Sequence, residues 1–351
     1  MIEAAIARRL VPAAALEVGD SRGALWRDAL GAMTFDAEAS PARESTIFDL
    51  ASLTKPTATT TVMLELCASG QLQLDEHVSA FFADWRGADR ERVTVRDLLE
   101  HASGLPPRLL DQPPLTRREF EHDICTVALA HAPRTAALYS DLGFILLAFL
   151  AADRGQASFA DQFDALWRRL VDARPLEAAG DEVLEFLPRP HRRPETAPTL
   201  PLDVDLRRGR TLVAEVHDNY AAALGGVAGH AGLFGNSAGV GLFARAILRA
   251  ARGDAMPAPL LPESIAQATI RSTVPGSSRA LGWDTMLPTS SCGTRMSQQA
   301  FGHVGFTGTS LWIDPIRDRY FVLLTNRACG GGTLDEMREL RRSFHDALGD
   351  F

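Results

Sequence analysis

Strand-like segments stand near both ends of this chain of 351 residues, and helical patterns fill the stretch between them. Ala13 to Val18 and Ala24 to Met33 are strand-like, and the turn at residues 19–23 joins them into a predicted β-hairpin. Near the other end, Ser310 to Asp314 and Arg319 to Thr325 are apolar, rich in aromatic and β-branched residues, and form a second hairpin pattern. The simplest fold therefore joins the two ends of the chain in one antiparallel sheet.

From about residue 70 to 250 the pattern is mostly helical. Helices are predicted at residues 2–10, Leu53 to Leu66, Val95 to His101, Leu138 to Asp153, Ser237 to Arg252, and from Thr333 onward. Thr94 with Asp97, and Thr333 with Glu336, fit capping boxes at two of these helices. The proline-rich stretch from Leu187 to Pro201 is predicted to be an exposed loop.

We therefore expect an α/β fold of the α+β type, in which helices flank an antiparallel sheet and a second lobe is helical. Residues 1–55 and 255–351 are predicted to form the sheet lobe, and residues 56–254 the mainly helical lobe. The functional pocket is expected between the two lobes.

Lys55 is the only lysine of the chain, so the other 35 of its 36 basic Lys and Arg residues are arginine. Arginine can fill most surface roles of lysine, but it does not lose its proton in a protein. A single retained lysine therefore indicates a role that requires a neutral amine. Ser52 stands three residues earlier, which completes the S-x-x-K pattern of serine acyl-transfer enzymes.

Residues three apart share one face of a helix, so Ser52 and Lys55 are expected to meet. The helix N-terminus and burial both favour the uncharged form of an amine, which could then accept the serine proton and create a nucleophile. The alternative interpretation is a capping serine beside an ordinary surface lysine.

Two further segments form a recognisable pattern together with Ser52 and Lys55. Tyr139-Ser140-Asp141 precedes an apolar helix, and His303-Val304-Gly305 leads into the last hairpin. In this order, the three patterns resemble the S-x-x-K, Y-x-N and K-T-G or H-T-G motifs of the class C β-lactamase superfamily, which also holds D,D-peptidases and serine esterases. Flanking segments match as well, at residues 48–51, 97–106 and 302–315.

This resemblance implies a β-lactamase/transpeptidase-like fold and a reaction through an acyl-enzyme. Ser52 would be the nucleophile, and Lys55 and Tyr139 would share the roles of general base and general acid. The backbone N–H groups of Ser52 and Phe306 would form the oxyanion hole.

The remaining motif positions, namely Asp141, His303, Val304 and Gly305, would bind the substrate. Two of them depart from the family pattern. Asp141 replaces the usual asparagine, which removes an amide donor, and His303 replaces the lysine of stronger β-lactamases. A histidine with an ordinary pKa near 6.5 carries little charge at pH 7.

Both departures favour an ester or a neutral amide over an anionic β-lactam. The expected activity is therefore that of an esterase or a D,D-peptidase-like hydrolase, with weak β-lactamase activity beside it. Acyl transfer to a specific acceptor, efficient β-lactam hydrolysis and a non-catalytic binding protein are the alternatives.

The resemblance implies that the partner is a small-molecule ester, amide or β-lactam. The net charge of −8 argues against binding to nucleic acid. The four cysteines, Cys67, Cys125, Cys292 and Cys329, show no metal spacing, so no metal is expected. The acyl-enzyme reaction that the resemblance implies needs no cofactor. The apolar run Phe144 to Ala152 is too short to cross a bilayer, and no membrane partner is expected. No secretory signal is visible, which predicts a cytoplasmic protein unless a leader was removed; the oligomeric state stays open.

A competing motif lies at Gly235 to Gly239, which fits the G-x-S-x-G nucleophile elbow, with Asp284 and His303 following as acid and base. The residues before it are poor strand formers, so Asn236 or Ser237 is interpreted as a helix cap instead. His101 and His230 are interpreted as structural, hydrogen-bonded side chains, and His230 is the one that could border the pocket.

Overall fold

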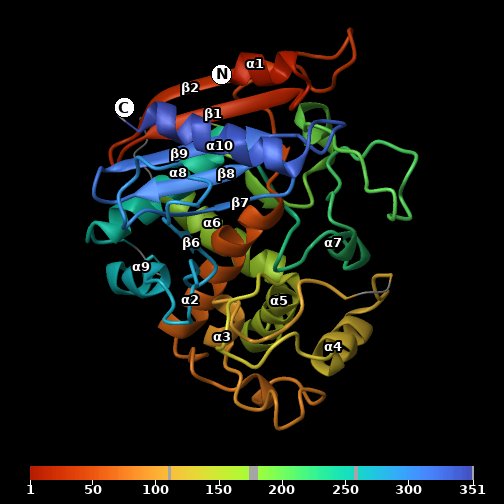
Figure 1. The fold of residues 1–351 in the computed structure, drawn as a ribbon, viewed down its shortest axis with the longest axis vertical. Coiled ribbons are helices and arrows are strands. Elements are labelled where there is room, and N and C mark those ends of the chain that lie inside the picture. The colour runs from red at the N-terminus through yellow and green to blue at the C-terminus, as the bar shows by residue number, and fades with distance from the viewer. Residues whose placement is uncertain (110–111, 174–180, 257–259, 350–351) are drawn as a thin grey trace.

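The computed structural model describes residues 1–109, 112–173, 181–256 and 260–349. Both ends of the chain contribute to one six-stranded antiparallel sheet, in the order β2-β1-β9-β8-β7-β6 (Figure 1). Its strands are β1 (Ala13–Gly19), β2 (Ala24–Gly31), β6 (Asp284–Thr285), β7 (Phe301–Val304), β8 (Ser310–Asp314) and β9 (Arg319–Thr325). The α/β fold with an antiparallel sheet flanked by helices is thus confirmed, as are both predicted hairpins.

Alternation along the central strands gives the sheet two apolar faces. In β9, Phe321 and Leu323 join one buried cluster, whereas Val322 and Leu324 join the other. Successive side chains of a strand point to opposite faces, so each face needs its own cover. Helices α1 (Ile2–Ala7) and α10 (Leu334–Leu348) cover the first face, and α8 (Ser237–Ala251) covers the second (Figure 1).

The remaining helices gather mainly in the lower part of the view (Figure 1). They are α2 (Thr61–Ala68), α3 (Val95–Leu99), α4 (Arg117–Thr126), α5 (Asp141–Gly155), α6 (Phe159–Asp172), α7 (Asn219–Ala223) and α9 (Pro262–Thr269). Short 3-10 turns lie at Val78–Ala80 and, inside the predicted loop, at Pro190–Glu195. Among the described residues, no single helix has the length and composition of a membrane span. Helices α5 and α6 have that length and composition only when taken together, and they are bent by 78° relative to each other.

The predicted mainly helical middle also contributes to a second, three-stranded sheet, which the sequence patterns did not indicate. Its strands run in the order β3-β5-β4, with β3 at Phe48–Asp49, β4 at Leu184–Phe186 and β5 at Leu233–Gly235. Strands of two or three residues are too short to display the alternation that identifies a strand. The predicted lobe boundaries at residues 55/56 and 254/255 stay a prediction.

The predicted helix from Leu53 to Leu66 is divided into three pieces. A 3-10 turn covers Ala51–Leu53, a π-helix covers Lys55–Thr60, and the α-helix α2 follows. Pro56 stands in the first turn of the π-helix, where a missing N–H group is tolerated. Single π turns inside helices frequently occur at functional sites.

Helix α5 begins three residues later than predicted, because the Ser140 side chain accepts a hydrogen bond from the Leu142 N–H and caps the helix there. The predicted capping boxes of α3 and α10 are both confirmed. Thr94 pairs with Asp97, and Thr333 pairs with Glu336.

Asn326, the residue directly after β9, binds three other segments of the chain and provides a test of this architecture. Its Oδ1 accepts from the Ala13 N–H at 3.2 Å, and its Nδ2 donates to the carbonyls of Met33 at 2.8 Å and Pro198 at 3.0 Å. We expect Asn326→Ala to lower the free energy of unfolding by about 2–4 kcal/mol in urea denaturation, because these buried groups lose their partner. Ile316→Ala, at a residue 60% exposed, is the control. Equal stability of both variants would contradict this role.

Candidate active site

Ser52 lies in the 3-10 turn, partly exposed to a pocket, and its backbone is fixed by the residues around it. Ala51 has a φ of 48°, in the left-handed region that non-glycine residues rarely adopt. The Asp49 carboxylate supports this conformation, since Oδ1 accepts the Ala51 N–H at 2.8 Å and Oδ2 accepts the His217 N–H at 2.7 Å. Burial raises the pKa of Asp49 to about 6. The strained turn presents the Ser52 hydroxyl at a defined place.

Lys55 and Tyr139 both reach the Ser52 hydroxyl. The contact between Ser52 and Lys55 is the one predicted from their spacing in the sequence. Lys55 Nζ lies 3.1 Å from Ser52 Oγ, and the Tyr139 hydroxyl lies 2.8 Å from the same atom. Tyr139 comes from the segment before α5 and packs against the His101 ring, with 4.6 Å between centroids. The adjacent Ser140 N–H donates to His101 Nδ1 at 3.0 Å. His101 is therefore a structural, hydrogen-bonded histidine, as interpreted from the sequence, and it holds the tyrosine segment.

The ammonium group of Lys55 has three acceptors. Besides Ser52 Oγ, these are Asp141 Oδ1 at 2.7 Å and the His230 carbonyl at 3.1 Å. The Lys55 side chain is fully buried. Burial lowers the pKa of Lys55, but the Asp141 carboxylate and the Tyr139 hydroxyl together raise it above the ordinary 10.5. The expected neutral amine is therefore wrong for the free protein, because Asp141 stands where the family has an uncharged asparagine.

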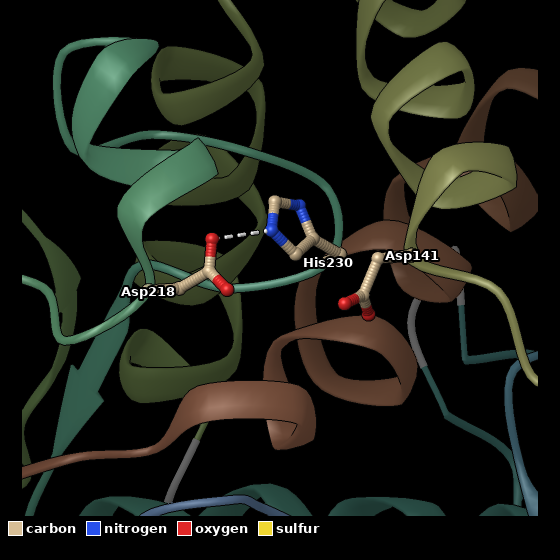
Figure 2. Close-up of side chains that lie close together, drawn as sticks. All are labelled: Asp141, Asp218 and His230. Carbon is tan, nitrogen blue, oxygen red and sulfur yellow. Dashed lines mark hydrogen bonds and ion pairs between the residues drawn. The ribbon is translucent and has the colours of Figure 1, made fainter. Parts of the chain in front are cut away.

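Asp141 also belongs to a wider charge network on the pocket wall. Arg108 Nη1 bridges Asp141 Oδ2 at 3.1 Å and Asp218 Oδ2 at 2.8 Å. His230 Nε2 lies 2.8 Å from Asp218 Oδ1. Figure 2 shows Asp141 at the start of α5, Asp218 just before α7, and His230 in the loop that precedes β5. The neighbouring cations hold the pKa of Asp141 below and that of Asp218 well below the ordinary value.

Asp141, Asp218 and His230 are also spaced closely enough to hold a metal ion, with one ligand atom of each within 4.8 Å of the others. A cation there would compete with two cations already in contact with the carboxylates. Lys55 and Arg108 occupy the Asp141 oxygens, and Arg108 and His230 occupy those of Asp218. The donor set thus fits a network of ion pairs better than a metal site.

The turn after β7 is attached directly to the segment that carries Ser52. Thr307 Oγ1 donates to the Asp49 carbonyl at 2.7 Å, and Thr309 Oγ1 donates to the Leu50 carbonyl at 2.9 Å. These contacts join positions that are 258 and 259 residues apart in the sequence. They fix the predicted oxyanion donors relative to each other.

The Phe306 N–H finds no acceptor among the described residues, and Phe306 lines the same pocket as Ser52. Two arginines bind the carbonyl groups of Gly305 and Phe306, one on each side of the Phe306 residue. Arg341 Nη2 donates to the Gly305 carbonyl at 2.6 Å, and Arg327 Nη2 donates to the Phe306 carbonyl at 2.7 Å. Since the Gly305 carbonyl and the Phe306 N–H belong to one peptide group, the Arg341 contact polarises that N–H as a donor.

His303, Val304 and Gly305 lie along the pocket, as the resemblance implied. His303 Nδ1 lies 2.9 Å from the Val304 carbonyl, and Nε2 has no hydrogen-bond partner within the described ranges. Burial, together with Arg279 and Lys55, holds the pKa of His303 well below 6.5. The imidazole is neutral at pH 7, so Nδ1 donates to the carbonyl and Nε2 is an acceptor.

The pocket has a volume of about 790 Å³. Several charged or polar side chains line it that the sequence did not identify as site residues, namely Arg108, His217, Asp218, Arg279 and Arg341, and His230 borders it as well. Arg108 and Arg279 reach the pocket from irregular segments, where no local pattern marks them. Asp218 was missed as well; its side chain accepts the Ala221 N–H and caps α7.

The competing elbow at Gly235 to Gly239 does not form a site. A short strand, β5, does precede it, contrary to the sequence expectation. However, Ser237 is fully buried and its hydroxyl contacts the Glu44 carbonyl at 3.4 Å. The Asn236 side chain accepts the Gly239 N–H at 2.8 Å, which confirms the interpretation as a helix cap.

Comparison with known proteins places this geometry in context. The family model described as Beta-lactamase matches residues 1–345. The chain is 29% identical to an N-acetylmuramyl-L-alanine amidase of Bacillus subtilis over 80% of this chain and 68% of that protein. It is also 29% identical to a putative D-alanyl-D-alanine carboxypeptidase of Salmonella gallinarum, over 82% and 70%.

Among solved structures, the fold is similar to that of a class C β-lactamase from Rhodobacter sphaeroides. The TM-score is 0.75 at 16% identity, over 99% of this chain and 97% of the other.

The Lys55–Asp141 ion pair predicts a pH-dependent stability. We expect Asp141→Asn to lower the free energy of unfolding by about 3–5 kcal/mol at pH 7, because it leaves a buried ammonium without its counter-charge. Burial then lowers the pKa of Lys55 below its unfolded value of 10.5. The loss should therefore shrink as pH rises toward 10.5, because Lys55 of the unfolded variant then progressively gives up the proton that its folded state has already released.

Denaturant titrations between pH 6 and 10.5 would measure this dependence. Asp254→Asn is the matched control, since it removes an exposed ion pair with Arg249 at 3.0 Å. An exposed pair contributes about 0–1 kcal/mol. Equal and pH-independent losses in the two variants would show that the Lys55–Asp141 pair contributes no special stability.

Proposed function

The chain belongs to the beta-lactamase family of serine hydrolases, and from that premise we propose that Ser52 cleaves an ester or amide through an acyl-enzyme. The observation that carries this proposal is the convergence of Lys55 Nζ and the Tyr139 hydroxyl on Ser52 Oγ, at 3.1 and 2.8 Å. Nucleophile and base within hydrogen-bond reach are the mark of an activated serine.

The proton of Ser52 needs an acceptor, and the protonated Lys55 is not one. Asp141 Oδ1, 2.7 Å from Nζ, is placed to take a proton from Lys55. When substrate fills the pocket and excludes water, charge separation becomes less favourable, which helps the ion pair turn into a neutral pair. Lys55 can then accept the Ser52 proton as Ser52 Oγ bonds to the substrate carbonyl carbon.

The oxygen of that carbonyl takes the negative charge. The N–H groups of Ser52 and Phe306 are placed to stabilise it, and each such donor is worth about 3–4 kcal/mol in related chemistry. The Tyr139 hydroxyl then donates its proton to the leaving oxygen or nitrogen and regains one from Lys55.

In the second step, the oxygen of water bonds to the acyl carbon while its proton passes through Tyr139 to Lys55. Lys55 returns a proton to Ser52 Oγ as the bond between Oγ and the acyl carbon breaks, which releases the acid. Asp141 then gives its proton back to Lys55, and the ion pair is restored.

The lack of positive charge at residue 303 favours neutral esters and amides over anionic β-lactams as substrates. His303, in place of a lysine, supplies no positive charge, since its pKa is lowered. We therefore place esterase or peptidase-like hydrolysis first and β-lactam hydrolysis behind it. Acyl transfer to an alcohol or amine remains chemically open, because such an acceptor can replace water in the second step.

An amide that ends in a carboxylate is the second candidate substrate, because Arg279 lines the pocket. Its guanidinium lies 5.2 Å from the centre of the Tyr139 ring, and it forms no ion pair within the described ranges. A guanidinium pairs well with a carboxylate. Faster hydrolysis of a carboxylate-bearing peptide than of its amidated analogue would favour this candidate.

Intact-mass spectrometry tests the nucleophile. Incubation with a phosphonate ester, an activated ester or a penicillin should add one adduct, and peptide mapping should place it on Ser52. Ser52→Ala should give no adduct, whereas Ser237→Ala, which removes the serine of the competing motif, should still be labelled. An adduct on another residue, or unchanged labelling of Ser52→Ala, would refute the proposal.

Lys55→Arg and Tyr139→Phe test the proton transfer. Each should lower kcat/KM for an activated ester by about 100-fold or more, because arginine does not take up the serine proton and phenylalanine lacks the hydroxyl. Tyr220→Phe is the control within the same pocket, since the Tyr220 hydroxyl donates to the Leu109 carbonyl instead.

Circular dichroism and thermal melting would establish that these variants remain folded. Near-normal turnover by folded Lys55→Arg protein would contradict the role given to Lys55.

A further inference from the structure

Part of the lining of the active-site pocket consists of apolar side chains that stand partly in water. They come from three distant segments, and their exposed fractions are 48% for Leu202, 64% for Val204, 37% for Phe306 and 49% for Leu334. Single exposed apolar residues are ordinary on protein surfaces, but a group of them lining one concave site indicates a ligand.

Contacts between the three segments show that this group is one region. The Phe306 ring stacks on His217 with 5.2 Å between centroids, and Arg327 lies 4.8 Å from the Phe306 ring centre. One residue beyond Arg327, the Ala328 carbonyl accepts the Leu200 N–H at 2.8 Å. The segment that carries Leu202 and the segment after β9 are therefore neighbours of Phe306.

The loop that presents Leu202 and Val204 is firmly attached on both sides. Thr199 pairs with Leu212 before it, through two backbone hydrogen bonds of 2.9 Å. After it, Arg207 binds the Asp205 carboxylate at 2.7 Å. The same guanidinium donates to the carbonyls of Val216 at 2.7 Å and His217 at 2.9 Å. The hydrogen bonds on both sides of the loop therefore hold Leu202 and Val204 in their exposed positions in the pocket.

The charged groups next to this apolar region have protein partners: the Arg327 guanidinium, beside the Phe306 ring, donates to the carbonyls of Phe306 and Gly332. Asp205 is paired with Arg207, and burial lowers the pKa of His217, so that its ring is neutral at pH 7. Phe306 links the region to the reaction, because its N–H is the proposed oxyanion donor and its side chain lines the apolar part. The apolar region and the carbonyl that Ser52 would attack therefore share Phe306 as a neighbour.

We propose that Leu202, Val204, Phe306 and Leu334 form a subsite for an alkyl or aryl group of the substrate. This inference rests on the proposed hydrolase function of the same pocket and specifies its substrate class. The natural substrate is then an ester or amide that carries an apolar chain on its acyl side or on its leaving-group side.

Two series of esters show whether the apolar chain belongs to the acyl side or to the leaving-group side of the substrate. One varies the acyl chain of p-nitrophenyl esters from acetate to octanoate, and the other varies the alcohol of alkyl acetates from ethyl to octyl. Burial of a methylene group predicts that kcat/KM rises roughly three- to fourfold for each of the first few methylenes added in one of the series. A flat profile in both series would overturn the subsite.

The double variant Leu202→Ser/Val204→Ser should flatten this chain-length dependence. Leu206→Ser is the matched control, because Leu206 belongs to the same loop and is 81% exposed but lies outside the described pocket lining. The control should keep the slope of the unmodified protein. An unchanged slope in the double variant would also overturn the proposal.

A binding measurement separates the subsite from the chemistry. With Ser52→Ala protein, isothermal titration should show tighter binding of hexanamide than of acetamide, with a negative heat-capacity change that the two serine substitutions remove. Failure of every ester to react, with no adduct on Ser52, would refute the hydrolase while this titration still decides the subsite. Equal binding of the two amides would overturn the subsite even if Ser52 is reactive.

Discussion

The buried contact between the Lys55 ammonium and the Asp141 carboxylate is the interaction on which the rest of the site depends. Lys55 has three acceptors within 3.1 Å, and one of them is the Ser52 hydroxyl. Arg108 shares the second Asp141 oxygen, so the negative charge is divided between two cations. In the proposed mechanism, the pair both positions the serine and stores the proton that must move before Ser52 can react.

The fold brings this pair to the substrate by joining distant parts of the chain. Hydroxyl groups of Thr307 and Thr309 attach the turn after β7 to the residues just before Ser52, so Ser52 and the Phe306 N–H are fixed together. Helix α10 adds Arg341, which binds the carbonyl of the same peptide group. The polar groups around Ser52 and the apolar region around Phe306 therefore line one pocket. This arrangement favours a substrate that carries both a reactive carbonyl and an apolar chain.

The sequence predicted what depends on short-range pattern and missed what depends on long-range contact. The two hairpins and the capped helices follow from local periodicity, and the meeting of Ser52 with Lys55 follows from a spacing of three residues. The charge state of Lys55 was predicted wrongly because Asp141 was assigned to substrate binding, whereas in the structure its carboxylate binds Lys55. Arg108 and Arg279 were missed because they reach the pocket from irregular loops, and the small sheet because its strands have only two or three residues.

Because Lys55 is the only lysine, its protonation can be read directly. Labelling with 13C,15N-lysine gives one side-chain signal, whose titration by NMR reports the pKa of Lys55 in the folded protein without any substitution. The account predicts that the ammonium signal persists to above pH 10.5, since Asp141 raises the pKa. A midpoint well below that value, with a neutral amine at pH 7, would contradict it.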